Sequence, residues 1–206
     1  MSSRYPMIAL DELNPDQKRF HKWLAIEARR FCRGVFTYQN PKTGAMAGIW
    51  THLLYLPRSL GMKYLSVAKA LAIVKGLPLR CREVAILAIG EFYGAQFELY
   101  AHTRVARKVG LSDSKIQDIL EGRPPLGGSE QEIIAWEVAR ALVGAGSESQ
   151  KGPLSEELWS RAERAFGKTG AGALIHYSGF YSYTCIILNG TATPVPAGER
   201  VWEGCL

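Results

Sequence analysis

The sequence lacks an uninterrupted apolar run of the length that a membrane-spanning helix requires. No stretch of the 206 residues approaches the roughly 18 uncharged apolar residues of such a helix. The N-terminal segment MSSRYPMIAL also has no apolar run resembling that of a secretory signal peptide. We therefore expect a cytoplasmic protein that has no membrane partner.

Cysteine is scarce, and no two cysteines lie close together along the chain. Cys32, Cys81, Cys185 and Cys205 form no Cys-x-x-Cys motif. Their wide spacing suits reduced thiols in an intracellular protein. Cys185 has no flanking histidine or basic residue that would activate a thiol, so a small buried hydrophobic role is favoured over that of a nucleophile.

A concentrated basic segment is also missing. The chain has 25 basic and 19 acidic residues, a formal net charge of +6 and a pI near 9.2, but the basic residues are scattered. No basic stripe alternates with exposed aromatic residues, which argues against a nucleic-acid partner. The charge supports only a mild preference for anionic small molecules.

No alternation typical of β-strands persists anywhere, whereas helical periodicity recurs along the whole chain. Capping residues and turn signals delimit the helices. We predict a single all-α domain over residues 1–206, with a candidate internal boundary in the GRPPLGG segment at 122–128. The predicted helices span approximately residues 15–32, 49–56, 59–75, 81–93, 95–109, 112–122, 129–142, 155–166 and 170–188.

The stretch from Pro78 to Leu111 is the most informative part of the sequence. Its first half is apolar nearly all round, which predicts a helix buried on most sides. On the second half, Glu98, His102, Val105 and Val109 follow one another at helical spacing and form one stripe. A carboxylate and an imidazole on an inward-facing stripe are costly to bury unless they pair or hydrogen-bond. The pattern therefore favours a functional Glu–His pair over a surface ion pair. Glu83 suits a functional role and a favourable position on the helix dipole about equally.

Several motifs in this stretch resemble the carboxymuconolactone decarboxylase and alkylhydroperoxidase D family. They are Arg82-Glu83, the segment GAQFE at 94–98, His102, and the segment ARKVGLS at 106–112. Redox members of the family have a glutamate at the start of a helix, a Cys-x-x-Cys pair, and a histidine four residues after the second cysteine. In this sequence Glu83 and His102 match the glutamate and the histidine, whereas Ala95 and Glu98 occupy the cysteine positions. The resemblance thus implies the non-redox, decarboxylase-like branch.

The resemblance implies an alkylhydroperoxidase-like helical bundle with a family-like core at about residues 43–190. It also implies Glu83, Glu98 and His102 as catalytic residues, and no cofactor. Arg82 is the candidate group for holding a substrate anion. The other substrate-binding candidates are Tyr93, Gln96, Tyr177 and Tyr181, although the last two, like His176, also suit packing on the final helix.

We expect a cofactor-independent lyase or isomerase acting on a small oxygenated acid, lactone or polyketide-like ring. Burial should raise the pKa of the Glu98 carboxyl group and lower that of the His102 imidazole, so that the two share a proton near neutral pH. His102 would be the proton shuttle, Glu98 would orient it, and Glu83 would be the second carboxylate.

Three alternatives remain at this stage. The first is a non-catalytic helical binding or assembly protein, and the second is an antioxidant that uses a different thiol. The third is a metal site on Glu98 and His102, for which further ligands would be needed. The resemblance also implies a homo-oligomer, for which the segment Ile49 to Leu56 is the candidate exposed apolar patch.

Overall fold

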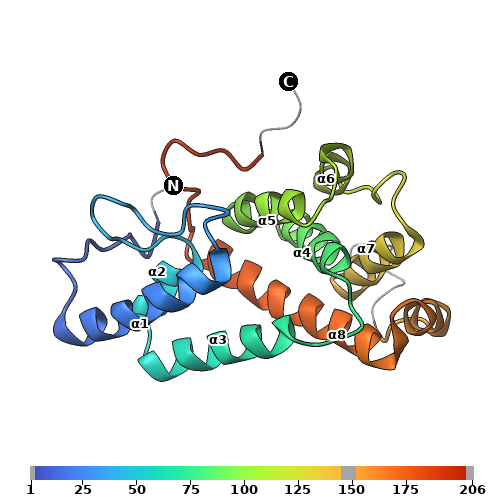
Figure 1. The fold of residues 1–206 in the computed structure, drawn as a ribbon, viewed down its shortest axis with the longest axis horizontal. Helices are drawn as coiled ribbons and strands as arrows, with labels where there is room; N and C mark the ends of the chain where they lie inside the picture. Colours follow the sequence, from blue (N-terminus) through green and yellow to red (C-terminus); the bar gives the residue numbers. More distant parts are fainter. Residues whose placement is uncertain (1–2, 145–151, 203–206) are drawn as a thin grey trace.

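The computed structural model describes residues 3–144 and 152–202, and within these ranges the protein is all-helical. Apart from an isolated β-bridge between Gln39 and Met46, the described residues contain no strand pairing. The all-α prediction is confirmed. The helices, which Figure 1 labels, are α1 (Pro15–Cys32), α2 (Ile49–Tyr55), α3 (Arg58–Ala72), α4 (Leu79–Tyr93), α5 (Gln96–Lys108), α6 (Asp113–Leu120), α7 (Glu130–Leu142) and α8 (Glu156–Gly190).

Helix α8 crosses the molecule and joins its two halves (Figure 1). Helices α1, α2 and α3 lie toward one end of the molecule, and α4 to α7 lie toward the other. The backbone of Gly167 is not helical, with φ of 66° and ψ of 166°, so α8 consists of two helices joined at a kink. The two helices predicted on either side of this glycine are therefore present.

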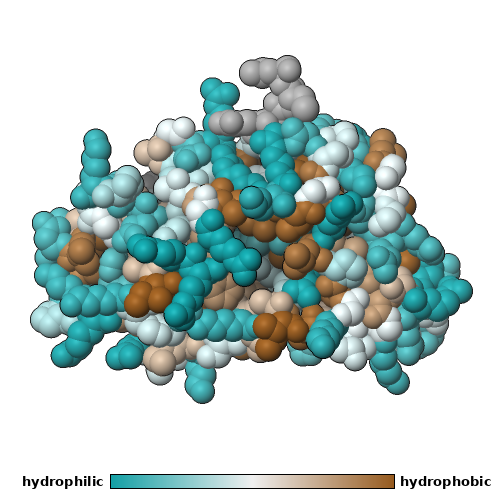
Figure 2. All heavy atoms as spheres, viewed as in Figure 1, coloured by the Kyte–Doolittle hydropathy of each residue, from teal (hydrophilic) through white to brown (hydrophobic). Residues whose placement is uncertain are grey.

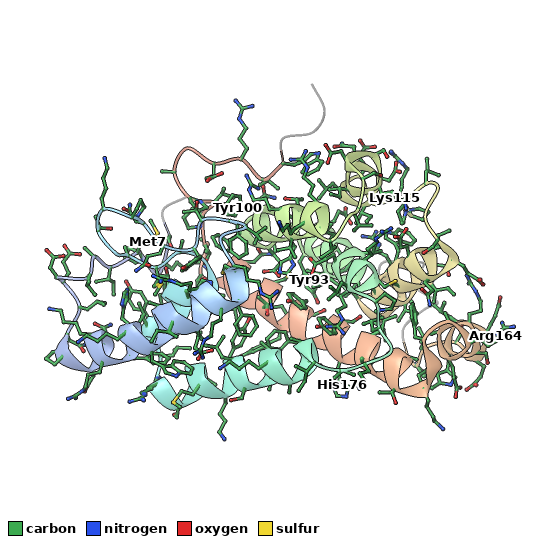
Figure 3. The ribbon with its side chains drawn as sticks, viewed as in Figure 1. Met7, Tyr93, Tyr100, Lys115, Arg164 and His176 are labelled. Carbon is green, nitrogen blue, oxygen red and sulfur yellow. The ribbon has the colours of Figure 1, made fainter. Side chains whose placement is uncertain are left out.

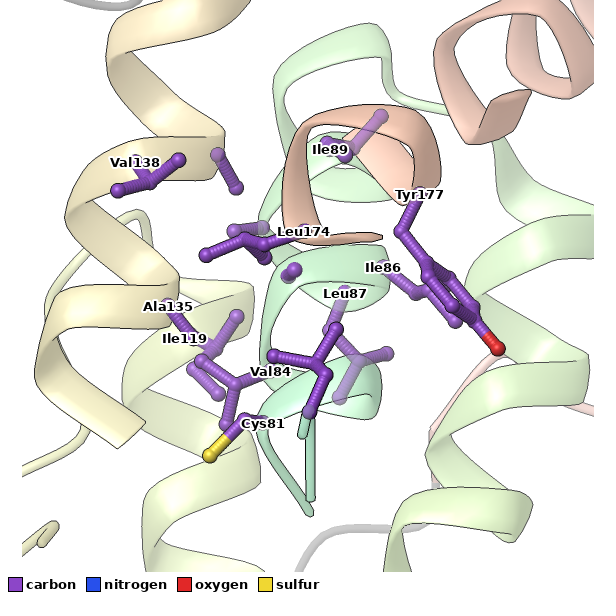
Figure 4. Packing of buried hydrophobic residues seen from close by; sticks show 14 of the residues in the cluster. Cys81, Val84, Ile86, Leu87, Ile89, Ile119, Ala135, Val138, Leu174 and Tyr177 are labelled. Carbon is purple, nitrogen blue, oxygen red and sulfur yellow. The ribbon is translucent and has the colours of Figure 1, made fainter. Parts of the chain in front are cut away.

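Helix α4 is the centre of the larger hydrophobic core (Figure 4). Every residue from Val84 to Ile89 is at most 1% exposed, because α5, α6, α7 and α8 all pack around this helix. Burying one Val, Leu or Ile side chain stabilises a fold by about 1.5–3 kcal/mol. The uninterrupted apolar run of α4 therefore explains its central position. Because other helices surround it, a polar side chain on α4 has few conformations available.

A second hydrophobic cluster joins α1, α2 and α3 to one another and, through Phe180 and Ile187, to α8. Trp50, Leu53 and Leu54 of α2 are buried in this cluster. Because these side chains of α2 are buried inside the protein, the prediction that residues 49–56 form an exposed apolar patch is wrong. The homo-oligomer stays a prediction, but this segment does not support it.

The predicted helix starts are confirmed by their caps. Asn14 and Ser129 each accept a hydrogen bond from the backbone of a first-turn residue and form reciprocal capping boxes with Gln17 and Glu132. Ser155 caps α8 in the same way without the reciprocal bond. Such caps contribute about 1 kcal/mol each, which is why they delimit helices reliably in the sequence.

Helices on both sides of the 122–128 segment contribute to the larger hydrophobic cluster, since α4 packs against both α7 and α8. The assignment of the whole chain to one domain stays a prediction. None of the helices in the described ranges has the length and apolar character needed to cross a bilayer.

Candidate active site

Helices α4 and α5 bring Glu83, Glu98 and His102 together. The buried first turns of α4 place Glu83 beside α5, where Glu98 and His102 lie one helical turn apart. Nδ1 of His102 lies 2.7 Å from Oε2 of Glu83, and Nε2 lies 3.1 Å from Oε1 of Glu98. The imidazole therefore lies between two carboxylates, one facing each ring nitrogen.

The two carboxylates determine the charge of His102. Burial alone lowers the pKa of the imidazole, but the negative charges of Glu83 and Glu98, together with the hydrogen bond to Glu83, outweigh burial and raise the pKa to about 10. At neutral pH the imidazole is consequently a cation. The expectation of a lowered pKa for His102 is therefore wrong, because two carboxylates, one facing each ring nitrogen, outweigh the effect of burial.

This charge predicts how folding stability depends on pH. The pKa of His102 is about 10 in the folded protein, against an ordinary value of 6.5 in the unfolded chain. Its contribution to stability is thus fully present below pH 6.5 and is lost as the pH rises through about 10. The difference in melting temperature between the wild type and His102→Gln should shrink over this window in calorimetry. A constant difference would contradict the assignment, and the exposed His176→Gln should show no such trend.

Glu98 is the least satisfied member of this group. Its side chain is only 6% exposed, and its Oε1 atom is buried without a hydrogen bond among the described residues. The approach to Nε2 of His102 is a charge contact, whereas the hydrogen bond of the ring goes to Glu83 through Nδ1. A buried carboxylate oxygen without a hydrogen bond costs free energy unless a ligand or water completes its coordination.

A cavity of about 580 Å³ adjoins these three residues. It lies between α1, α2 and α3 on one side and α4, α5 and α8 on the other, and its lining is mainly apolar. On the face shown in Figure 2 the surface is hollowed near its centre, with hydrophobic side chains at the edge of the hollow. Val105 and Val109 are half-buried and line the cavity together with Glu98 and His102, so the predicted stripe of α5 faces a ligand-sized space.

Aromatic residues of α8 and α3 complete the wall around the imidazole. The ring of Tyr181 meets His102 edge-on at a centroid distance of 5.1 Å, and Tyr177 stacks on Tyr181 at 5.9 Å. Both tyrosines line the cavity and also pack against the larger core. Their role in substrate binding stays a prediction. The sequence did not reveal Tyr64 and Thr184, which also line the cavity and whose hydroxyl groups lie 2.8 Å apart. Their helical spacing is that of ordinary core residues, so no sequence signal distinguishes them.

Arg82 has a structural role that the sequence did not suggest. Its guanidinium donates to the carbonyl oxygens of Ala72, Val74 and Leu77 at 2.6–2.9 Å, and to the hydroxyl of Tyr177 at 3.2 Å. Although Arg82 borders the cavity, most of its donors are committed to the connection between α3 and α4. The expected role of Arg82 in holding a substrate anion is therefore not supported.

Three other candidates lie away from the cavity. Tyr93 packs at the edge of the larger core, and its carbonyl oxygen accepts a hydrogen bond from Asn189. Gln96 is exposed and bonds to the carbonyl oxygen of Gly94. His176 is exposed on α8 (Figure 3). None of the three lines the cavity. The assignment of substrate contacts to Tyr93 and Gln96 stays a prediction that this cavity does not support.

The described cysteines are buried thiols. Burial raises the pKa of Cys32 and Cys81 to about 12 and that of Cys185 above its ordinary value. Only thiolates react readily with peroxide or alkylating reagents. Cys205 lies outside the described residues. The thiol-based antioxidant alternative is consequently disfavoured.

In a Cys205→Ser variant, we expect the remaining three thiols to react with iodoacetamide only as the protein unfolds. Peroxide turnover with a dithiol reductant should be absent, because Ala95 and Glu98 occupy the cysteine positions. Mass spectrometry of the alkylated protein and a coupled peroxidase assay would check both points. Rapid labelling of Cys32 or Cys185 in the native protein would contradict the burial argument.

In residues 3–144 and 152–202 no group of three or more His, Cys, Asp or Glu side chains has a metal-binding arrangement. Both ring nitrogens of His102 already face carboxylates.

The fold and the site together resemble those of an alkylhydroperoxidase-like helical bundle, with Ala95 and Glu98 at the two positions where redox members have cysteines. Residues 61–141 match the model of the Carboxymuconolactone decarboxylase family. The family resemblance found in the sequence is thereby confirmed, and this segment contains Glu83, Glu98 and His102.

One solved structure is similar over nearly the whole chain. It is described as an alkylhydroperoxidase AhpD core, an uncharacterized peroxidase-related protein from Ralstonia eutropha JMP134. The TM-score is 0.68 at 16% sequence identity, and the match covers 95% of this chain and 93% of that one. At this identity the match supports the fold alone. A search of curated proteins found no match.

Proposed function

We propose that the protein is a cofactor-independent lyase or isomerase that moves protons next to a carbonyl group of a small oxygenated acid, lactone or polyketide-like ring. The observation that carries the proposal is the Oε1 atom of Glu98, a buried carboxylate oxygen without a hydrogen bond at the wall of a 580 Å³ cavity. If the Glu–His–Glu contact had only a structural role, we would expect this oxygen atom to accept a hydrogen bond. A buried carboxylate oxygen that meets a cationic imidazole through a charge contact alone is instead suited to general acid–base chemistry.

The charge of His102 changes the roles expected for the three residues. Because the imidazole is protonated, Glu98 rather than His102 is the base in the resting protein. Oε1 of Glu98 would take a proton from the carbon or hydroxyl group next to the substrate carbonyl. The Nε2–H of His102 would donate to the carbonyl oxygen as negative charge develops on it, and Glu83 would hold the imidazolium through Nδ1–H.

The second half of the reaction returns the protons. In an isomerisation, the proton on Glu98 would go to a different carbon of the enolate. In a decarboxylation, the electron pair of the broken C–C bond would remain on the substrate as an enolate, which then takes a proton as carbon dioxide leaves. Neither route changes the oxidation state of a protein group, which agrees with the absence of the Cys-x-x-Cys pair.

The experiment is to incubate the protein in deuterium oxide with a panel of 3-oxo acids, hydroxylated ring acids and lactones. Deuterium incorporation next to the carbonyl would be followed by NMR, together with release of carbon dioxide. We expect enzyme-dependent exchange with at least one class, and its loss in Glu98→Gln. Exchange that is unchanged in Glu98→Gln would reject the proposal. The cytoplasmic location and the homo-oligomer are part of the same proposal.

A further inference from the structure

The two ends of the cavity differ in their hydrogen-bonding chemistry, and this difference indicates what kind of molecule fits it. At the inner end, Glu98 offers the Oε1 atom that has no hydrogen bond. An ionised carboxylate can only accept hydrogen bonds. A ligand that reaches this point must therefore bring a donor.

Tyr64 adds a second acceptor at the same end. The Thr184 hydroxyl donates to the carbonyl oxygen of Phe180 at 3.0 Å, and its oxygen lies 2.8 Å from the Tyr64 hydroxyl. Since the single proton of Thr184 is used, Tyr64 must donate its own proton to Thr184. The lone pairs of the Tyr64 oxygen are then the part of this hydroxyl left for a ligand.

The outer end of the cavity is cationic. Arg30, Arg33, Lys69 and Lys108 are exposed side chains of the cavity lining, whereas the carboxylates of the lining, Glu27, Glu83 and Glu98, are buried. Glu27 contacts Arg30 at 3.3 Å and Lys69 at 2.5 Å. Arg33 and Lys108 are exposed and have no ion-pair partner among the described residues. This end has an excess of positive charge that an anion would neutralise.

Glu98 and Lys108 line the cavity from positions far apart along α5. Glu98 lies in the first turn of α5 and Lys108 is its last residue, a separation of ten positions that corresponds to an axial rise of ~15 Å. The wall between the ends is apolar and aromatic, with contributions from Phe31, Trp50, Leu65, Phe97 and Phe180.

We propose that this cavity binds an amphiphilic hydroxy acid. Its carboxylate lies among the cations at the mouth, its apolar ring or chain lies against the aromatic wall, and its hydroxyl or enol group donates to Glu98. The inference rests on the proposed function in taking the Glu98 end as the reacting end, and it names the substrate class. An enolic hydroxyl at this point is also the group from which Glu98 would take a proton.

Calorimetric titration with matched compounds tests the proposal without requiring turnover. The reference probe is para-hydroxyphenylpropanoate. It is compared with phenylpropanoate, which lacks the hydroxyl group, and with para-hydroxyphenylpropanol, which lacks the carboxylate. Homologues with shorter and longer chains between ring and carboxylate allow for the spacing. We expect the best hydroxy acid to bind at least about tenfold more tightly than either matched compound, because each comparison removes one charge-assisted hydrogen bond.

Variants separate the two ends. Glu98→Leu should abolish the preference for the hydroxyl and keep the preference for the carboxylate. The double variant Arg33→Ala, Lys108→Ala should do the reverse, and Arg29→Ala, an exposed cation of α1 outside the cavity lining, should change neither. If Glu98→Leu does not melt cooperatively, Tyr64→Phe is used in its place, because it removes the second hydrogen-bond acceptor at the inner end and should weaken the preference for the hydroxyl.

Equal binding of the hydroxylated and unhydroxylated acids throughout the series would overturn the proposal. So would equal binding of acid and alcohol, or no binding by any member. Binding with the expected preferences but without deuterium exchange in any panel would leave this inference standing and reject the proposed function.

Discussion

Glu98→Gln and His102→Gln are each expected to lower the turnover of the accepted substrate by about two to four orders of magnitude, the usual size of a general acid–base contribution. Gln at position 98 keeps the volume and some hydrogen-bonding capacity but removes the base. Gln at position 102 removes the cation that stabilises charge on the substrate. The measurement is kcat and kcat/KM for both variants, with melting temperatures recorded on the same samples.

The double variant should be scarcely slower than the slower single variant, since the two groups act as one unit and their effects are not additive. His176→Gln is the matched control, because this exposed histidine of α8 does not line the cavity. A fully active His102→Gln protein would end the catalytic interpretation. If only the melting temperature falls while activity per folded molecule is retained, the Glu–His–Glu group is structural.

Arg82→Met is expected to cause a large loss of stability. It leaves the carbonyl oxygens of Ala72, Val74 and Leu77 without their charged donor; the bond to Leu77 is buried and the other two are partly buried. Hydrogen bonds from charged groups contribute about 1.5–3 kcal/mol each, and unsatisfied buried acceptors are costly. We therefore expect a loss of about 3 kcal/mol or more, which lowers the melting temperature of a chain of this size by roughly 6–12 °C.

Arg80→Met is the control for this measurement. Arg80 is on the same helix, but its side chain is 55% exposed and its charge contact with Glu132 is 3.9 Å long. Such surface contacts contribute about 0–1 kcal/mol. Calorimetry on both variants would separate the structural role of Arg82 from a role in substrate binding. Substrate binding lost in Arg82→Met at unchanged melting temperature would restore the original interpretation.

The revised role of Arg82 also moves the expected site of anion binding. The cations that line the mouth come from α1, α3 and α5, and Arg30 and Arg33 precede the segment that matches the family model. The family motif therefore accounts for the reacting end of the cavity, whereas the N-terminal helices supply part of the end that distinguishes ligands.

The sequence by itself determined the helices, their caps and the pairing of Glu98 with His102. Each depends on local spacing: a cap acts within three residues, and a helical repeat puts positions four apart on one face. The continuous apolar run from Val84 to Ile89 also predicted a central buried helix, because no other arrangement removes all its faces from water.

Only the tertiary structure decided the charge and surroundings of the site. The contact between Glu83 and His102 joins two helices, so the raised pKa of the imidazole depends on a distance that no periodicity encodes. In the same way, Arg82 was a candidate for holding a substrate anion, but the connection between α3 and α4 places three carbonyl oxygens around it. Tyr64 and Thr184 became part of a cavity through the packing of α3 against α8. Electrostatics and cavities depend on side chains far apart in the sequence, and these positions are set by packing.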